Sequence, residues 1–259
     1  MKKLCVIGAG NMGGALLAGF LAAGKFAPGA LLAFDKDTEK LNKKAGELGF
    51  TPAPSLREGV SAADTVLIAC KPDKVESVVG EVRDLLPGKA LLSIALGWDY
   101  ARYAALLPAG VRVQFIMPNT PAFVGSGVFL FEEANSLEAG EREEIAGLFS
   151  ALGRVFELPS AQMGIGGAIT GCGPAFVDLM IEAFADAGVL YGLPRDKALV
   201  MVSAMIEGSA KLQKETGTHP GVLKDAVCSP GGSTIRGVAA LEDAGFRSAC
   251  ISAIRAIMK

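Results

Sequence analysis

The sequence predicts an α/β protein in which a doubly wound parallel sheet is followed by an all-helical domain. Short apolar runs alternate with stretches of helix length from Leu4 to about Ser160, and strand patterns disappear after about Gln162. The length of 259 residues and the 51% hydrophobic content suit two domains, each with its own core. We therefore expect domain limits at residues 1–161 and 162–259.

The predicted strands are continuous apolar runs, as expected for strands that carry helices on both faces of a sheet. They cover residues 4–7, 31–34, 65–69, 90–94, 111–116 and 127–131. The stretches between them have the length of crossover helices. These predicted helices cover residues 11–23, 38–48, 72–86, 98–107 and 136–152.

The second domain begins with a long helix, because Pro174 suits a first turn and apolar residues then repeat at spacings of four and three. That stripe consists of Phe176, Met180, Ala183, Ala187 and Leu190. Further helices are expected at 195–214, 220–227, 233–243 and 246–258. Their apolar faces exceed what about a hundred residues can bury internally, so we expect this domain to dimerise.

Charge and composition exclude several partners. The net charge of −2 provides no basic surface for nucleic acid, and apolar runs such as 65–70 are shorter than the roughly 18–20 residues of a membrane span. The apolar run after the first lysines, residues 4–7, is too short for a signal peptide, so we expect a cytoplasmic protein. Five dispersed cysteines and a single histidine predict reduced thiols and no metal site.

A glycine-rich turn follows the first predicted strand and opens the first predicted helix. Its residues are Gly8, Ala9, Gly10, Asn11, Met12 and Gly13, which fit G-x-G-x-x-G. In this context the motif predicts a Rossmann-type domain, with the pyrophosphate of a dinucleotide at the helix N-terminus. We expect NADPH or NADH as the cofactor.

The end of the second predicted strand bears on the choice between these two cofactors. Asp35 is placed to accept hydrogen bonds from the ribose hydroxyls of NADH, whereas Lys36 would meet the 2′-phosphate of NADPH. The choice stays open on these residues. Asp35 also fits a turn residue ahead of the next helix.

A second cofactor contact is expected where the third predicted strand meets its helix. Cys70, Lys71 and Pro72 stand at this edge of the sheet, where nicotinamide ligands gather. The alternative for Lys71 is an exposed charge ahead of a helix that begins with proline.

Several segments together resemble the pyrroline-5-carboxylate reductase family, in order and spacing, over nearly the whole chain. They lie at residues 8–20, 69–72, 117–127, 171–176, 192–198 and 219–249. The last segment, HPGVLKDAVCSPGGSTIRGVAALEDAGFRSA, is the most specific. The resemblance implies NAD(P)H-dependent reduction of L-1-pyrroline-5-carboxylate to L-proline, the last step of proline biosynthesis. It also implies that homodimers assemble into a decamer.

By this resemblance the substrate loop consists of Ser229, Gly231, Gly232, Ser233 and Thr234 at a helix N-terminus. Backbone N–H groups there would bind a small carboxylate where the helix dipole is positive. The family pattern implies that the Thr234 hydroxyl contacts the ring nitrogen of the imine, which makes Thr234 the catalytic residue. The alternative is an ordinary Ser/Thr N-cap in a glycine turn.

The resemblance adds Ala69 and Asn119 to the cofactor residues, although an Asn-Thr-Pro turn is the ordinary alternative for Asn119. His219 is expected to be structural, beside Pro220 at a helix start. The sequence departs from the family pattern at Cys172, where serine is usual, and at Leu96, where a small residue is usual. Ser233 also stands where threonine is common.

Two rival functions remain on the sequence alone. One is a related Rossmann-type reductase acting on another cyclic imine or a keto acid, and the other is a non-catalytic NAD(P)-sensing module. The family of β-hydroxyacid dehydrogenases is expected to carry a lysine base on the long helix, and residues 164–193 contain no lysine.

Overall fold

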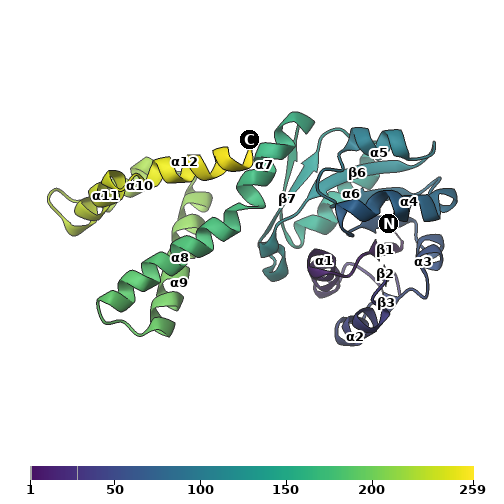
Figure 1. Ribbon diagram of the computed structural model, residues 1–259, viewed down its shortest axis with the longest axis horizontal. Coiled ribbons are helices and arrows are strands. Elements are labelled where there is room, and N and C mark those ends of the chain that lie inside the picture. Colours follow the sequence, from purple (N-terminus) through teal and green to yellow (C-terminus); the bar gives the residue numbers. More distant parts are fainter. Residues whose placement is uncertain (1, 28) are drawn as a thin grey trace. The chain divides into compact units, whose positions relative to one another are not determined.

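The computed structural model describes residues 2–27 and 29–259, which form two compact units (Figure 1). The first unit ends at Gly171 and the second begins at Cys172. In the first unit the described strands form one sheet in the order β3-β2-β1-β4-β5-β6-β7-β8. Their bounds are Leu4–Ile7 (β1), Leu31–Phe34 (β2), Thr51–Pro52 (β3), Thr65–Ile68 (β4), Ala90–Ser93 (β5), Arg112–Met117 (β6), Gly127–Glu132 (β7) and Gly153–Leu158 (β8).

Helices cover both faces of this sheet, as the apolar strands predict. Their bounds are Asn11–Ala22 (α1), Thr38–Leu48 (α2), Leu56–Ala62 (α3), Val75–Val82 (α4), Tyr100–Leu106 (α5) and Ala139–Ser150 (α6). Along β1, Leu4 and Val6 pack with α1, α2 and α6, whereas Cys5 and Ile7 pack with α3, α4 and α5. This alternation gives each face its own apolar core.

The predicted α/β class is confirmed, with one departure from a fully parallel sheet. Strands β6 and β7 pair antiparallel, with Ile116 opposite Phe131, while the other pairs are parallel. Their connection, residues 118–126, holds only a short 3₁₀ helix, Thr120–Val124 (η3). It is shorter than the roughly dozen residues that a parallel crossover needs, so the chain turns back instead.

The predicted helix at 72–86 is divided in three. A 3₁₀ turn, Pro72–Lys74 (η1), precedes α4, and a second one, Arg83–Leu85 (η2), follows it. The sequence pattern did not predict β3, α3 or β8. Strands β3 and β8 are the two edges of the sheet, and β8 alternates half-buried and exposed side chains instead of forming a continuous apolar run.

Helix α7, Ser160–Thr170, packs on the sheet of the first unit. Its Met163 is buried with Phe115 of β6 and Leu130 of β7. Gly167 lets α7 approach Met117 of β6, because a Cβ at Gly167 would lie 2.2 Å from the Met117 sulfur. The first compact unit therefore continues beyond residue 161.

The second unit consists of helices joined by glycine and proline turns. They are Gly173–Leu190 (α8), Arg195–Thr216 (α9), Pro220–Ala226 (α10), Ser233–Asp243 (α11) and Phe246–Ile257 (α12). Helices α8 and α9 lie side by side (Figure 1), and each buries a single alanine, Ala185 and Ala198. The predicted helices of this region are confirmed to within a few residues.

The described chain contains one stretch, Ser160–Leu190, that is long and apolar enough to cross a membrane by length and composition alone. Most of it is not buried within the chain. Phe176, Leu179 and Phe184 of α8 are among its exposed apolar side chains. An apolar surface of this kind fits association with another protein chain as well as it fits lipid.

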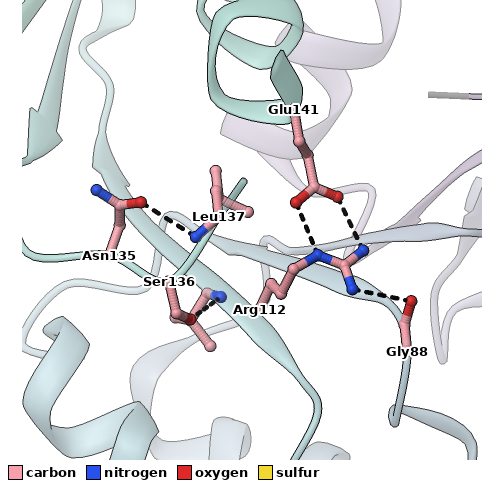
Figure 2. A network of polar contacts seen from close by, with 7 residues as sticks. Gly88, Arg112, Asn135, Ser136, Leu137 and Glu141 are labelled. Carbon is pink, nitrogen blue, oxygen red and sulfur yellow. Dashed lines mark hydrogen bonds and ion pairs between the residues drawn. The ribbon is translucent and has the colours of Figure 1, made fainter. Parts of the chain in front are cut away.

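Arg112 of β6 joins three parts of the first unit (Figure 2). Its guanidinium donates to both carboxylate oxygens of Glu141 in α6, at 2.8 and 3.0 Å, and to the Gly88 carbonyl at 3.2 Å. Nearby, the Ser136 hydroxyl accepts from the Val113 N–H at 2.8 Å. The bond to Glu141 raises the pKa of Arg112 above its ordinary value. This bidentate pair fixes α6 against the sheet.

We expect Arg112→Leu to lower the free energy of unfolding by about 1.5–3 kcal/mol, because a partly buried bidentate pair is lost. Arg57→Leu is the matched control, since its pair with Asp84 is about half exposed and screened by solvent, so its loss should change stability much less. Urea unfolding followed by circular dichroism measures both variants. Equal losses of unfolding free energy in the two variants would show that the Glu141 contact contributes no more to stability than an exposed ion pair.

Candidate cofactor and substrate sites

The glycine-rich turn between β1 and α1 is closely packed. Gly8 has φ +102°, and a Cβ on it would lie 2.8 Å from the carbonyl carbon of Ala69. A Cβ on Gly13 would lie 1.9 Å from the Gly8 carbonyl oxygen. The first and third glycines therefore let β1, α1 and the end of β4 meet backbone to backbone.

The second glycine faces open space. Gly10 is the N-cap of α1, and apart from its two chain neighbours no described residue has a heavy atom within 4 Å of a Cβ built on it. The first N–H groups of α1 have no partner within the helix, as at any helix start. This is a cradle that a side chain would fill, and it fits the close approach of a pyrophosphate.

A cavity of about 290 Å³ opens beside this turn. It brings together seven of the predicted cofactor residues: Gly8, Gly10, Asp35, Lys36, Ala69, Cys70 and Lys71. Lys74 and Val78 also line it and were not predicted. Of the other predicted cofactor residues, Ala9 and Gly13 are buried under the turn, while Asn11 and Met12 begin α1.

Asp35 holds the glycine turn directly. One carboxylate oxygen accepts from the Ala9 N–H at 2.8 Å and the other from the Asp37 N–H at 3.1 Å. Asp37 in turn caps α2 by accepting from the Lys40 N–H at 3.0 Å. Asp35 therefore acts as a turn residue ahead of α2, which was the alternative prediction for it. It also lines the cavity.

Three lysines line the same cavity, namely Lys36, Lys71 and Lys74, and all are exposed. They make this side of the cavity positive, although Lys74 also pairs with Asp73 at 2.9 Å. Cys70 is partly buried beside them, and burial raises the pKa of its thiol, which keeps it protonated near neutrality.

The single tryptophan of the chain binds the backbone of Pro72. The Trp98 indole N–H donates to the Pro72 carbonyl at 3.0 Å, and the ring is buried. The Arg102 guanidinium lies 3.7 Å above the centre of the Trp98 ring. Tyr103, also buried, donates from its hydroxyl to Ser93 at the end of β5, at 2.7 Å. Of these contacts, the bond to the Pro72 carbonyl holds the segment that carries Cys70 and Lys71.

Asn119 is buried, and backbone groups occupy both ends of its side-chain amide. Its oxygen accepts from the Val128 N–H at 2.8 Å, and its nitrogen donates to the Thr170 carbonyl at 3.0 Å. The side chain thereby ties β7 and α7 to the loop after β6. Contact with the cofactor stays a prediction for this residue.

The predicted substrate loop lies in the second unit, where it turns into α11. Gly231 has φ +68°, and a Cβ on Gly232 would lie 2.4 Å from the Ser229 hydroxyl oxygen. Ser229 and Thr234 are exposed. Gly232 is the N-cap of α11. The predicted alternative, a Ser/Thr N-cap, is therefore not what the structure has.

The loop differs from expectation in one contact. The Gly232 N–H donates to the Ser229 carbonyl at 3.0 Å, so it is not free for a ligand. The N–H groups of Ser233 and Thr234 remain in the first turn of α11, where a helix leaves its donors unpaired. Arg236 adds a further contact by donating to the Gly231 carbonyl at 3.1 Å.

His219 is structural, as expected. Its Nδ1 accepts from the Gly221 N–H at 3.1 Å and caps α10. In the part of the chain that the structure describes, no group of three or more His, Cys, Asp or Glu side chains is placed to hold a metal ion.

Sequence patterns did not single out Lys44 of α2. Its ammonium donates to the carbonyls of Ala9 and Gly10, at 2.7 and 3.1 Å. Nothing local marks this lysine among the charged residues of α2, because its partners stand 34 and 35 positions earlier in the chain. Lys74, in contrast, could have been predicted, because it follows Lys71 by one 3₁₀ turn and so lies near the same edge of the sheet.

Comparison with known proteins extends over both units. The family model for pyrroline-5-carboxylate reductase dimerisation matches residues 160–259, and a model for NADP oxidoreductases that are coenzyme F420-dependent matches residues 3–97. Pyrroline-5-carboxylate reductase of Treponema pallidum (strain Nichols) is 40% identical over 97% of each chain. That of Escherichia coli (strain K12) is 36% identical over 100% of this chain and 96% of its own.

A solved structure agrees with these relatives. The crystal structure of Plasmodium falciparum pyrroline carboxylate reductase with NADP bound has a TM-score of 0.89 and 30% identity, covering 98% of this chain and 95% of its own. The doubly wound sheet, the glycine turn and the positive cavity beside it define a Rossmann-type oxidoreductase that uses a nicotinamide dinucleotide. Its second unit carries a dimerisation domain. The chain belongs to the pyrroline-5-carboxylate reductase family.

Proposed function

We propose that this protein reduces L-1-pyrroline-5-carboxylate to L-proline with NADPH or NADH, the last step of proline biosynthesis. The observation that carries the proposal is the match to reductases of this name at 36–40% identity, across both the dinucleotide-binding unit and the helical unit. The close-packed glycine turn before α11 supports it, because such a turn admits a small anion at the start of an eleven-residue helix.

The substrate carboxylate binds at the N-terminus of α11. The N–H groups of Ser233 and Thr234 point along the helix dipole toward the anion, and the Ser229 hydroxyl lies beside them. Gly231 and Gly232 keep this approach free of side chains. Recognition therefore depends on backbone donors, which discriminate a carboxylate from an uncharged ring.

The chemistry needs little from acids or bases of the protein. A protonated cyclic imine is already electrophilic, so positioning and exclusion of water contribute most of the rate. A reduced nicotinamide bound in the cavity beside the glycine turn would supply the hydride that this reduction needs. The π electron pair of the C=N bond passes to the ring nitrogen, so the protonated imine becomes a neutral secondary amine. The Thr234 hydroxyl contacts that nitrogen and assists the protonation that makes the imine electrophilic.

NADPH is the preferred cofactor in this proposal. Both Asp35 oxygens already accept backbone N–H groups, and Lys36, Lys71 and Lys74 place positive charge around the cavity. These positive charges strengthen the binding of a 2′-phosphate, whereas they add little to the binding of a ribose hydroxyl. The NADP seen in the Plasmodium falciparum relative supports this preference.

The assembly in this proposal is a homodimer formed through the second unit. The exposed apolar side chains of α8 and α9, with Phe176 and Met201 among them, supply the surface to be buried. Dimers assemble further into a decamer, as the family resemblance implies. The protein acts in the cytoplasm, without membrane or nucleic-acid partners.

The test follows the oxidation of NADPH and of NADH separately, with L-1-pyrroline-5-carboxylate, the same ring without its carboxylate, and an open-chain keto acid. We expect the pyrroline carboxylate to give the highest kcat/KM, NADPH to exceed NADH, and the ring without a carboxylate to be at least about tenfold poorer. A faster keto acid would replace the proposed substrate. Tight NADPH binding without turnover of any imine would indicate a sensor.

A further inference from the structure

Lys44 approaches the glycine turn from the side of α2. Its ammonium donates to the Ala9 carbonyl at 2.7 Å and to the Gly10 carbonyl at 3.1 Å. The side chain is only partly exposed. Gly14 of α1 provides the space, because a Cβ there would lie 2.7 Å from the Lys44 ammonium nitrogen. The lysine side chain is therefore packed against the glycine turn.

Ala9 is held on both sides by opposite charges. Asp35 accepts from its N–H at 2.8 Å, and Lys44 donates to its carbonyl. Ala9 itself is buried. The two charged side chains come from the end of β2 and from α2, so the position of the turn is set by tertiary contacts and not by the glycines alone.

We propose that Lys44 is a positioning residue for the dinucleotide, which fixes the glycine turn and raises its affinity for the pyrophosphate. The proposal rests on the use of NADPH by this site and is independent of the identity of the imine. It assigns no direct contact with the cofactor to Lys44.

The two carbonyls that Lys44 contacts belong to particular peptide groups. The Ala9 carbonyl shares its peptide with the Gly10 N–H, and the Gly10 carbonyl shares its peptide with the Asn11 N–H. A charged donor on a carbonyl polarises the whole peptide, so its N–H becomes a stronger donor. These N–H groups lie at the start of α1, where the pyrophosphate is expected.

The charge of Lys44 adds a second effect. An ammonium held behind the turn contributes positive potential at the start of α1, in the same direction as the helix dipole. Because the ammonium is partly buried, this contribution is screened less by salt than that of exposed lysines such as Lys43.

The test compares Lys44→Met, Lys44→Arg and Lys43→Met in the full-length protein. Methionine keeps the length of the side chain and removes the charge, while Lys43 is an exposed lysine of the same helix. The dissociation constant for NADPH is measured by fluorescence titration without any imine. Thermal unfolding without cofactor shows whether each variant is folded.

We expect Lys44→Met to raise the dissociation constant about tenfold, as loss of a charge-assisted contact implies. Lys43→Met should stay within about twofold of the unchanged protein, and Lys44→Arg should recover most of the affinity because its charge is kept. With a turnover assay in hand, Lys44→Met should raise KM for NADPH and leave kcat at saturation unchanged.

Three results would overturn the inference: an unchanged dissociation constant in Lys44→Met, equal losses in Lys44→Met and Lys43→Met, or equal losses in Lys44→Met and Lys44→Arg. A folded Lys44→Met that unfolds at a lower temperature but binds NADPH normally would likewise assign Lys44 to stability. The titration contains no imine, so its results test the role of Lys44 even if the protein does not reduce the proposed substrate.

Discussion

Gly13→Ala will lower the free energy of unfolding by about 1–3 kcal/mol and remove measurable binding of NADPH. The added Cβ would lie 1.9 Å from the Gly8 carbonyl oxygen and 3.2 Å from the Ala69 Cβ. Neither neighbour can yield as the end of a flexible side chain can. Either α1 or the turn has to move, and the N–H groups at the start of α1 move with it.

Gly10→Ala separates binding from folding at the same turn. Apart from the two chain neighbours, no described residue has a heavy atom within 4 Å of a Cβ at this position, so the variant should unfold like the unchanged protein and still bind NADPH poorly. Gly46→Ala, in the exposed part of α2, is the control and should affect neither property adversely. Urea unfolding and NADPH titration measure all three. Normal NADPH binding by Gly13→Ala would refute the packing argument.

Thr234→Ala is expected to lower kcat about 100-fold and to change the dissociation constant for NADPH by less than about threefold. The physical reason is that its hydroxyl is proposed to contact the ring nitrogen of the substrate, while the glycine turn proposed to bind the dinucleotide belongs to the other unit. Thr234→Ser keeps the hydroxyl and should recover much of kcat. Steady-state kinetics and NADPH titration give the two quantities.

Thr216→Ala is the matched control for Thr234→Ala. Thr216 is also an exposed threonine of the helical unit, and its hydroxyl donates to the Leu212 carbonyl near the end of α9, at 2.9 Å. Its replacement should leave kcat unchanged. If Thr234→Ala weakens NADPH binding as strongly as it lowers kcat, Thr234 belongs to the fold and not to the chemistry.

The sequence predicted those parts of the fold in which local pattern and tertiary environment agree. Strands such as β1 and β2 are buried on both faces, so they appear as apolar runs. The helices of the second unit are separated by glycine and proline, which mark their ends directly. α9 begins after Pro194 and ends before Gly217, a C-cap residue with φ +63°.

Edges and junctions were harder to predict, for physical reasons. β3 contains only two residues, Thr51 and Pro52, and it pairs only along one side. α7 is rich in glycine, which lowers helix propensity, and tertiary packing of Met163 and Gly167 offsets that loss. The division of the chain at residue 161 stays a prediction, because contacts group α7 with the sheet while the family model begins at 160.

The cofactor site shows the same limit. Motif spacing located the glycine turn and the edge formed by Cys70 and Lys71, because these residues are local in sequence. It gave no sign of Lys44, whose role comes from a contact between α2 and the turn. Asn119 was named as a cofactor residue, but its two backbone contacts were not predicted, because the partners stand 9 and 51 positions away.

Trp98 gives this protein an internal optical probe. It is the single tryptophan of the chain, and its indole N–H is bonded to Pro72, next to Lys71 of the cofactor cavity. Tryptophan emission therefore reports on the dinucleotide-binding unit alone, since the helical unit contains none. Unfolding of the two halves can be followed separately, with emission for the first and far-ultraviolet ellipticity for the sum.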